Sequence, residues 1–294
     1  MTQIHWLDPV SGNFNTATDW SGGVVPGAAD DAILDAAGSP FTVTITTSGT
    51  VDGVGLAANA TLLVGTSFTA TNGTDGGVNA GSILVSRRGR FVVGGALTNT
   101  GSILLFGGRS RHASATEIIK GSVTLEGGGT FSLTGASTIK GGGKGAVLTN
   151  VDNTISGGGS LGISSNTPRL AVNNEAGGVI DATSSHGLGL AYDRPSSNSG
   201  LMEATGGGVL LVVDTTIDNT GGRIEASSGG TVVITTLATV TGGAISSGAG
   251  STVEVMGIST VTGATLSTAA TGVLAISNLA TVIAEGIVAN AGTI

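Results

Sequence analysis

Seven basic side chains in the first half of the sequence could bind an anion. They are Arg87, Arg88, Arg90, Arg109, Arg111, Lys120 and Lys140. Arginine holds carboxylates and phosphates through paired hydrogen bonds, so this group suits acidic glycans or the phosphates of lipopolysaccharide. The same spacing separates 88–90 from 108–110 and Lys120 from Lys140, which predicts that these side chains stack on adjacent turns of a repeating chain. The alternative is a solvated basic face that only keeps the protein soluble.

A second group lies in the most irregular segment of the sequence, residues 181–199. It contains Asp181, His186, Tyr192, Asp193 and Arg194. Enzymes that cleave or modify polysaccharides use paired carboxylates, or an aspartate with a basic residue, for acid and base catalysis. The sequence leaves three interpretations of this loop open: catalysis, contact with a glycan, or a loop held together by a local contact between Asp193 and Arg194.

Charge is distributed unevenly along the chain. Residues 1–86 hold seven acids and no Lys or Arg, residues 87–223 hold eleven bases and nine acids, and residues 224–294 hold three acids and no base, for a net charge of −8. Nucleic-acid binders are normally basic, so we expect no nucleic-acid partner. The sequence has no apolar run of about 18 residues, so we expect no insertion of this segment into a membrane.

The sequence offers neither a set of metal ligands nor a cofactor motif. It has no Cys and 3 His, and the glycine runs 141–143 and 206–208 do not precede a helix that could bind phosphate. We therefore expect no metal and no cofactor. The lack of Cys also suits a protein that folds outside the cell.

The elements that must position these residues are short strands arranged in a repeat. Thr, Val and Ile favour extended backbone, and 53 Gly supply turns. In the C-terminal third, five apolar columns recur with a period of 21: Ile224, Ile245, Leu266 and Ile287; Val232, Val253 and Leu274; Ile234, Val255 and Ile276; Leu237, Ile258 and Leu279; Val240, Val261 and Val282. The period is 22 upstream, from Ile180 through Met202 to Ile224. Nearer the N-terminus a period of 20 joins the glycines Gly81, Gly101, Gly121 and Gly141.

A repeat with a period of 20 to 22 and three short apolar groups predicts an all-β fold, a right-handed parallel β-solenoid. Equivalent strands of successive turns would pair ~4.8 Å apart, which places Ile224 above Ile245. A leucine-rich repeat has a similar period, but its Leu-x-x-Leu-x-Leu frame is absent. We assign residues 40–294 to the solenoid.

Residues 1–39 lack the repeat and contain both tryptophans, Trp6 and Trp20. A solenoid needs a cap over its first turn because an exposed strand edge invites aggregation, so we assign this segment as an N-terminal cap. We expect the indoles to plug the first turn, with a sugar-stacking platform as the alternative. At the other end the sequence stops inside a repeat. We expect the solenoid either to continue in a longer protein or to associate end to end with another chain.

The cap segment carries a frame found in a known group of proteins. After His5-Trp6-Leu7-Asp8 it reads Asp19-Trp20-Ser21-Gly22-Gly23, Pro26-Gly27 and Asp30-Asp31-Ala32. This frame resembles the N-terminal region of large bacterial secreted β-strand-repeat proteins, which include autotransporter passengers and haemagglutinin-like adhesins. The resemblance implies a right-handed β-solenoid, a secreted or surface location and an adhesive or matrix role, and it transfers no catalytic residue. The sequence departs from an autotransporter routed through the Sec system because its start lacks a signal peptide.

Together these patterns predict a structural or adhesive rod, not an enzyme. We expect an extracellular bacterial protein that attaches to glycans or cell-surface polymers, or that assembles into a biofilm matrix or filaments. A polysaccharide lyase, hydrolase or epimerase on the same scaffold is the alternative. A groove with converging acids would favour the enzyme, and a smooth shaft would favour adhesion.

Overall fold

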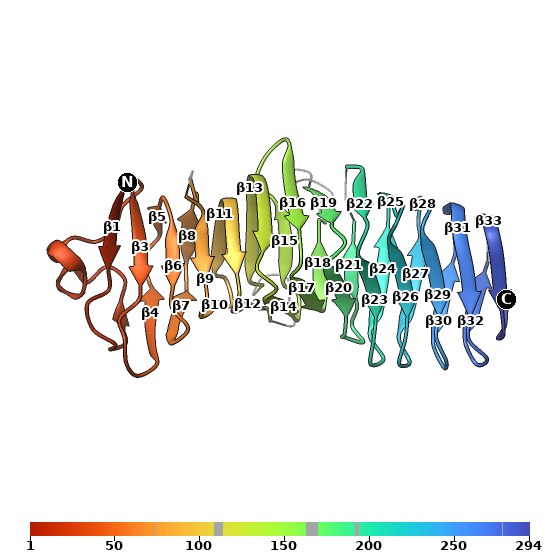
Figure 1. Ribbon diagram of the computed structural model, residues 1–294, viewed down its shortest axis with the longest axis horizontal. Helices are drawn as coiled ribbons and strands as arrows, with labels where there is room; N and C mark the ends of the chain where they lie inside the picture. Colours follow the sequence, from red (N-terminus) through yellow and green to blue (C-terminus); the bar gives the residue numbers. More distant parts are fainter. Residues whose placement is uncertain (74, 109–113, 163–169, 192–193, 278) are drawn as a thin grey trace.

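The chain forms one elongated parallel β-solenoid, with its two termini at opposite ends (Figure 1). The computed structural model describes residues 1–73, 75–108, 114–162, 170–191, 194–277 and 279–294, and it leaves the side chains of 285–287 undescribed. All pairings between the strands named below are parallel, and the chain visits three columns of stacked strands in turn. The predicted solenoid is therefore confirmed, whereas its right hand stays a prediction from the general preference of parallel crossovers.

Each column is a ladder of equivalent strands. The first column contains β1 (Thr2–His5), β3 (Asp30–Leu34), β6 (Val54–Leu56), β9 (Gly77–Asn79), the ends of β11 (Arg90–Asn99) and β13 (Thr116–Glu126), β16 (Ala146–Asn150), β19 (Leu170–Asn174), β22 (Ser196–Asn198), β25 (Thr216–Asp218), β28 (Thr239–Thr241) and the starts of β31 (Thr260–Thr268) and β33 (Thr281–Asn290). The second contains β2 (Gly12–Asn13), β4 (Phe41–Ile45), β7 (Ala60–Val64), β10 (Ser82–Val85), β12 (Ser102–Phe106), β14 (Thr130–Thr134), β17 (Thr154–Gly157), β20 (Val179–Ala182), β23 (Leu201–Ala204), β26 (Arg223–Ala226), β29 (Ala244–Ser247) and the ends of β31 and β33. The third contains β5 (Gly49–Val51), β8 (Ser67–Ala70), the starts of β11 and β13, β15 (Thr138–Gly141), β18 (Gly159–Leu161), β21 (Leu188–Leu190), β24 (Val209–Val213), β27 (Thr231–Thr235), β30 (Thr252–Val255) and β32 (Val273–Ile276).

The core is built by alternation within each strand. In β27 the side chains of Val232 and Ile234 are fully buried, while those of the intervening residues are partly exposed. Ile224 pairs with Ile245 in adjacent parallel strands, as their spacing in the sequence predicts. Like apolar residues therefore stack along the axis, and the strand backbones are hydrogen-bonded between turns.

Two details of the repeat differ from the sequence prediction. Ser102 pairs with Thr130 rather than with Ser122, because extra residues come between the end of β12 and the start of β13 and again within β13, between Ile119 and Val123. The segment after Gly121 consequently pairs with β11 rather than with β12. In addition, Leu237, Ile258 and Leu279 are not core residues: they lie outside the strands at the corner after the third column and are 59%, 63% and 81% exposed. Residues at a constant spacing in the sequence occupy equivalent positions in successive turns, but the spacing does not indicate whether those positions face the core or the solvent.

A ladder of asparagines, which the apolar pattern did not predict, fills the corner between the first and second columns. Seven Asn side chains are buried there and most donate an amide hydrogen bond to the next: Asn79 to Asn99 (2.7 Å), Asn99 to Asn153 (2.8 Å), Asn150 to Asn174 (2.9 Å), Asn174 to Asn198 (2.8 Å) and Asn198 to Asn219 (2.7 Å). The sequence signal is the recurring Asn-x-Gly at 79–81, 99–101, 198–200 and 219–221. Most of these amides also bond backbone groups, so the ladder satisfies most of the polar atoms that the corner removes from water; Oδ1 of Asn79, at its start, is buried without a hydrogen-bond partner.

Aromatic side chains fill the N-terminal end of the shaft. Trp6 and Trp20 are 3% and 0% exposed and meet edge to face at 5.0 Å, and Phe14 packs edge to face on Trp20 at 5.0 Å. Both indoles are thus buried, as predicted for plugs, and neither offers a ring face for stacking. Because β1 pairs with β3, residues 1–39 already contain the first strands of the ladder, and their separate role as a cap stays a prediction.

Candidate functional site

The described part of the predicted basic group lies around the third column. Arg87 and Arg88 occupy the turn between β10 and β11, and Arg90 is the exposed first residue of β11. The guanidinium carbon of Arg87 lies 5.5 Å from the ring centroid of Phe106, whose side chain is 45% exposed. This cation–π contact holds Arg87 over the neighbouring turn. Arg109 and Arg111 lie outside the described residues.

The two lysines do not stack on each other. Lys140 in β15 pairs with Ile118, so Lys120 is not its register partner. The backbone N–H of Arg88 donates to the carbonyl of Ser114, and Arg90 pairs with Thr116. The predicted stacking of 88–90 on 108–110 involves residues outside the described part of the chain. The prediction that Lys120 and Lys140 stack was wrong because the spacing between register partners here is longer than the period assumed from the glycines.

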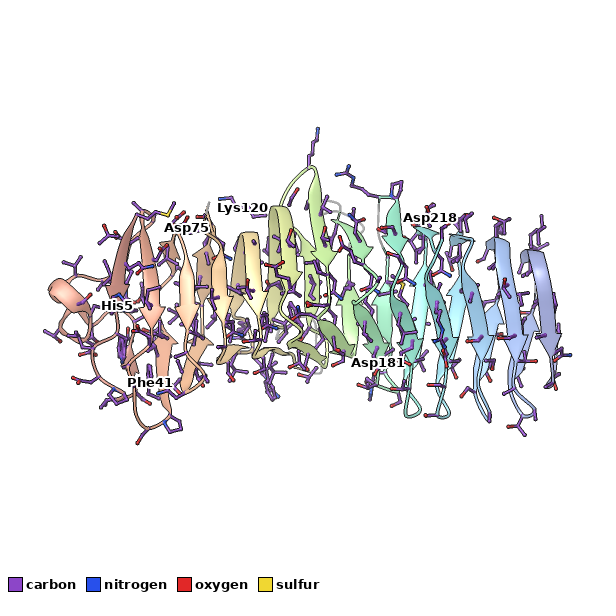
Figure 2. All side chains as sticks on the ribbon, in the orientation of Figure 1. His5, Phe41, Asp75, Lys120, Asp181 and Asp218 are labelled. Atoms are coloured by element: carbon purple, nitrogen blue, oxygen red, sulfur yellow. The ribbon has the colours of Figure 1, made fainter. Side chains whose placement is uncertain are left out.

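The bases nevertheless occupy one region of the shaft, here termed the basic patch: Arg87, Arg88, Arg90, Lys120 and Lys140. Arg88 and Arg90 lie where the chain enters the third column, and Lys140 lies on its outer surface. Lys120 lies where β13 leaves the third column (Figure 2). Ion pairs between described residues join His5 to Asp35 and Arg223 to Glu225, and neither involves the basic patch.

Glu117 does not neutralise the basic patch, although it is close in sequence. Its side chain is 1% exposed and stands in the core between its register partners Phe91 and Ile139. Burial raises the pKa of the Glu117 carboxyl well above its usual range. Its atom Oε2 has no hydrogen-bond partner.

The structure describes three of the five residues in the loop proposed from the sequence as a second site: Asp181, His186 and Arg194. Asp181 lies in β20, where the hydroxyl of Thr205 donates to both carboxylate oxygens at 2.9 and 3.1 Å. His186 lies in the exposed turn before β21, and its backbone N–H donates to the Ser184 hydroxyl. Arg194 precedes β22 and approaches Gly145 instead. Among the described residues, no contact joins these three side chains, and Tyr192 and Asp193 lie outside that set.

A row of carboxylates that the sequence reasoning missed begins at Asp181. Asp181 pairs with Glu203, and Glu203 pairs with Glu225, on the outer surface of β20, β23 and β26. Burial raises the pKa of Glu203, and the neighbouring carboxylates Asp181 and Glu225 add to the shift, while Arg223 opposes it. Burial also raises the pKa of Asp181, against the hydrogen bond from Thr205. The equal spacing of the three acids was the signal.

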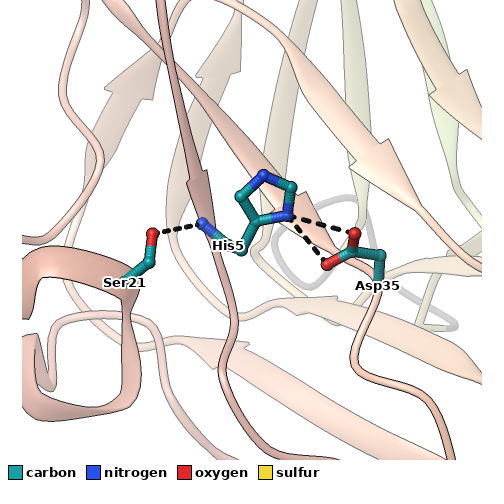
Figure 3. Close-up of polar contacts among 3 residues, drawn as sticks. All are labelled: His5, Ser21 and Asp35. Atoms are coloured by element: carbon teal, nitrogen blue, oxygen red, sulfur yellow. Dashed lines mark hydrogen bonds and ion pairs between the residues drawn. The ribbon is translucent and has the colours of Figure 1, made fainter.

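A further polar contact ties the first turns together. The Nδ1 atom of His5 lies 3.1 and 3.0 Å from the two carboxylate oxygens of Asp35, and the His5 backbone N–H donates to the Ser21 hydroxyl at 2.9 Å (Figure 3). The two side chains are 42% and 49% exposed, so this pair contributes little to stability. It joins β1 to the segment that follows β3.

Among the described residues, no group of three or more His, Cys, Asp or Glu side chains is placed to hold a metal ion. No helix within the described ranges is long and apolar enough to cross a membrane.

Comparison with known proteins finds a structural likeness and no family. No family model matches the chain, and no curated protein matches it. Among solved structures, the TibA fragment that was hyper-glycosylated by TibC catalysis is similar, with a TM-score of 0.44 and 15% sequence identity. The alignment covers 98% of this chain and 97% of that fragment.

Proposed function

We propose that the chain is a structural and adhesive rod of a secreted or surface-exposed bacterial protein, and that it attaches to anionic glycans. The ladder of parallel strands from β1 to β33 supports a shaft, which at ~4.8 Å per turn extends for about 60 Å. Such a shaft holds its surface residues in fixed positions, and many weak contacts along it add up through multivalency. The frame around Trp6 and Trp20 supports the extracellular location.

The observation that carries the ligand class is the basic patch, which forms no ion pair among the described residues and lies on an acidic chain. Residues 1–86 and 224–294 contain no Lys or Arg, so a polyanion is repelled from both ends and attracted to the turns that carry Arg88, Arg90 and Lys140. Sulfate, phosphate and uronate groups fit the paired donors of arginine.

Binding of heparin and polygalacturonate to an immobilised chain tests this proposal. We expect the triple variant Arg88→Ala, Arg90→Ala, Lys140→Ala to lose at least tenfold in affinity and to show a weaker salt dependence. The matched control is Arg223→Ala, because the guanidinium of Arg223 already pairs with Glu225 on the same shaft. Equal affinity of the triple variant and the parent chain would overturn the assignment. Labelling of intact producing cells with an antibody against the chain tests the location.

Self-association along the shaft axis, and assembly into a matrix or filaments, belong to the same proposal. Light scattering over a range of concentrations tests it. We expect the apparent mass to rise with concentration, and a constant monomer mass would remove this part.

The carboxylate row favours one alternative, a polysaccharide-active enzyme. Register partners such as Asp181 and Glu203 lie about 5 Å apart by strand spacing, near the separation of the two acids of retaining glycosidases. The raised pKa of Glu203 also suits a general acid. Turnover of neutral or uronate polysaccharides that disappears in Glu203→Gln would support catalysis, and no turnover by the parent chain would leave the adhesive rod alone.

A further inference from the structure

We propose that a pocket at the N-terminal end of the shaft binds a compact organic cation, the primary ammonium group of an amino sugar or of a lysine side chain. The pocket has a volume of about 210 Å³. Its lining combines an indole, an apolar rim, two carboxylates and two hydroxyls: Trp6, Asp8, Val10, Ser11, Thr18 and Asp19. Sites for drug-sized ligands occupy roughly 300–1,000 Å³, so this pocket accommodates one compact group and not an oligosaccharide.

The backbone builds the pocket by bringing two segments together. Trp6 and Trp20 form an antiparallel bridge, and the backbone N–H of Leu7 donates to the carbonyl of Asp19 at 2.9 Å. The indole Nε1 of Trp6 donates to the carbonyl of Val10 at 3.1 Å, which fixes the segment between them as one wall. Behind this wall, the edge-to-face stack of Trp6, Trp20 and Phe14 runs into the core, so the floor is rigid before any ligand arrives.

Gly12 packs tightly against two of the lining residues. A Cβ atom there would lie 2.9 Å from Cζ2 of Trp6 and 3.0 Å from Oδ2 of Asp19. Any side chain at this position would therefore displace the indole or the carboxylate that line the pocket. The same distances show that the Asp19 carboxylate lies close to the edge of the Trp6 indole, so both are presented to the pocket together.

The charge of the pocket selects the ligand. Asp8 and Asp19 are hydrogen-bond acceptors, so a ligand must supply donors, and a cation supplies charge-assisted ones. No Lys or Arg occurs before Arg87, and the imidazole of His5 contacts Asp35 outside the pocket. Val10 is 65% exposed and, with the indole edge, covers the carbon atoms of the bound molecule.

Calorimetric titration of the full chain tests the site with ligands that differ in one group. Glucosamine carries an ammonium where N-acetylglucosamine carries a neutral amide and glucose a hydroxyl. Nα-acetyl-lysine presents the ammonium on a chain, so its comparison with glucosamine separates the two sources. At matched ionic strength, we expect saturable binding of an ammonium ligand and at least tenfold weaker binding of both neutral sugars.

Variants locate the binding. Asp19→Asn and Asp8→Asn should each weaken ammonium binding at least fivefold, while Asp35→Asn, which removes an acid outside the pocket, should leave it unchanged. Thermal unfolding by circular dichroism shows which variants fold. The proposal would be overturned if the folded parent chain bound no ammonium ligand, or if it bound glucosamine and N-acetylglucosamine with equal affinity. It would also be overturned if Asp19→Asn and Asp35→Asn lost equal affinity. A third contrary result would be that Ca²⁺ alone gives the same saturation and displaces the amine. The site is separate from the basic patch, so its failure would leave the adhesive rod untouched.

Discussion

The amide Nδ2 of Asn198 donates a 2.7 Å hydrogen bond to Oδ1 of Asn219, which is the equivalent residue one turn further along the shaft. Asn198 in turn accepts a 2.8 Å bond from Asn174. These residues are buried, and the Nδ2 groups of Asn174 and Asn198 also donate to backbone carbonyls. The corner of the solenoid is thus held by side-chain bonds between turns together with bonds to the backbone.

Replacing Asn198 by Ala should therefore destabilise the shaft by about 1–3 kcal/mol, because the change leaves Oδ1 of Asn219 buried without its donor, whereas Nδ2 of Asn174 keeps its bonds to the carbonyls of Gly178 and Leu201. Urea unfolding followed by circular dichroism measures the effect. The control is Ser197→Ala, which removes a partly exposed hydroxyl that bonds Asn173 in the neighbouring strand. A similar loss of stability in both variants would show that the ladder adds nothing beyond an ordinary hydrogen bond.

Glu117→Gln should reduce the dependence of stability on pH. The pKa of Glu117 is raised in the folded chain by burial, whereas in the unfolded chain the carboxyl titrates near ~4.3. Between these two values the folded state binds more protons than the unfolded state, so stability falls as the pH rises through that window and is greatest below it.

Urea midpoints at several values from about pH 4 to pH 8 check this prediction. The parent chain should lose more stability over that range than Glu117→Gln does. Glu126→Gln, a change of an exposed acid at the end of the same strand, should behave like the parent chain. Parallel curves for the parent chain and Glu117→Gln would contradict the prediction.

Arg223→Ala should raise the pKa of Glu203 further. Burial, Asp181 and Glu225 all raise it, and Arg223 is the group that lowers it. Carboxyl chemical shifts followed by NMR titration report the value directly. Conversely, Glu225→Gln should lower the pKa of Glu203 because it removes a like charge from the adjacent strand. An unchanged titration of Glu203 in both variants would mean that its neighbours do not act on it.

Gly208→Ala should destabilise the chain by at least about 2 kcal/mol, as expected for forced overpacking. A Cβ atom at this position would lie 1.9 Å from the carbonyl oxygen of Ala182 in the preceding turn. Thermal unfolding measures the loss. Gly143→Ala is the control, since a Cβ atom there meets nothing within 4 Å. If both variants unfold at the same temperature, the turns are not packed as closely as the structure has them.

The sequence predicted the fold more completely than it predicted the candidate sites, which needed the structure. The spacing of bases located the region of Arg88 and Lys140, but the assumed period placed the wrong residues beside each other. The extra residues between β12 and β13 shift the register, and sequence spacing does not indicate where such residues are inserted. The pocket at Trp6 also required coordinates, because the Trp6–Trp20 bridge joins its two walls.

The sequence by itself determined the parallel ladder, because equal spacing of β-branched and apolar residues, such as Ile224 and Ile245, has a single physical cause: stacking of equivalent positions along one axis. Only the tertiary structure decided which equivalent positions face inward and which polar residues meet. Leu237 and Ile258 keep the same spacing as core residues yet lie exposed at a corner, while Glu117 occupies the core. The reason is that a repeat fixes the distance between turns, whereas the direction of each side chain is set by the corner and strand in which it lies.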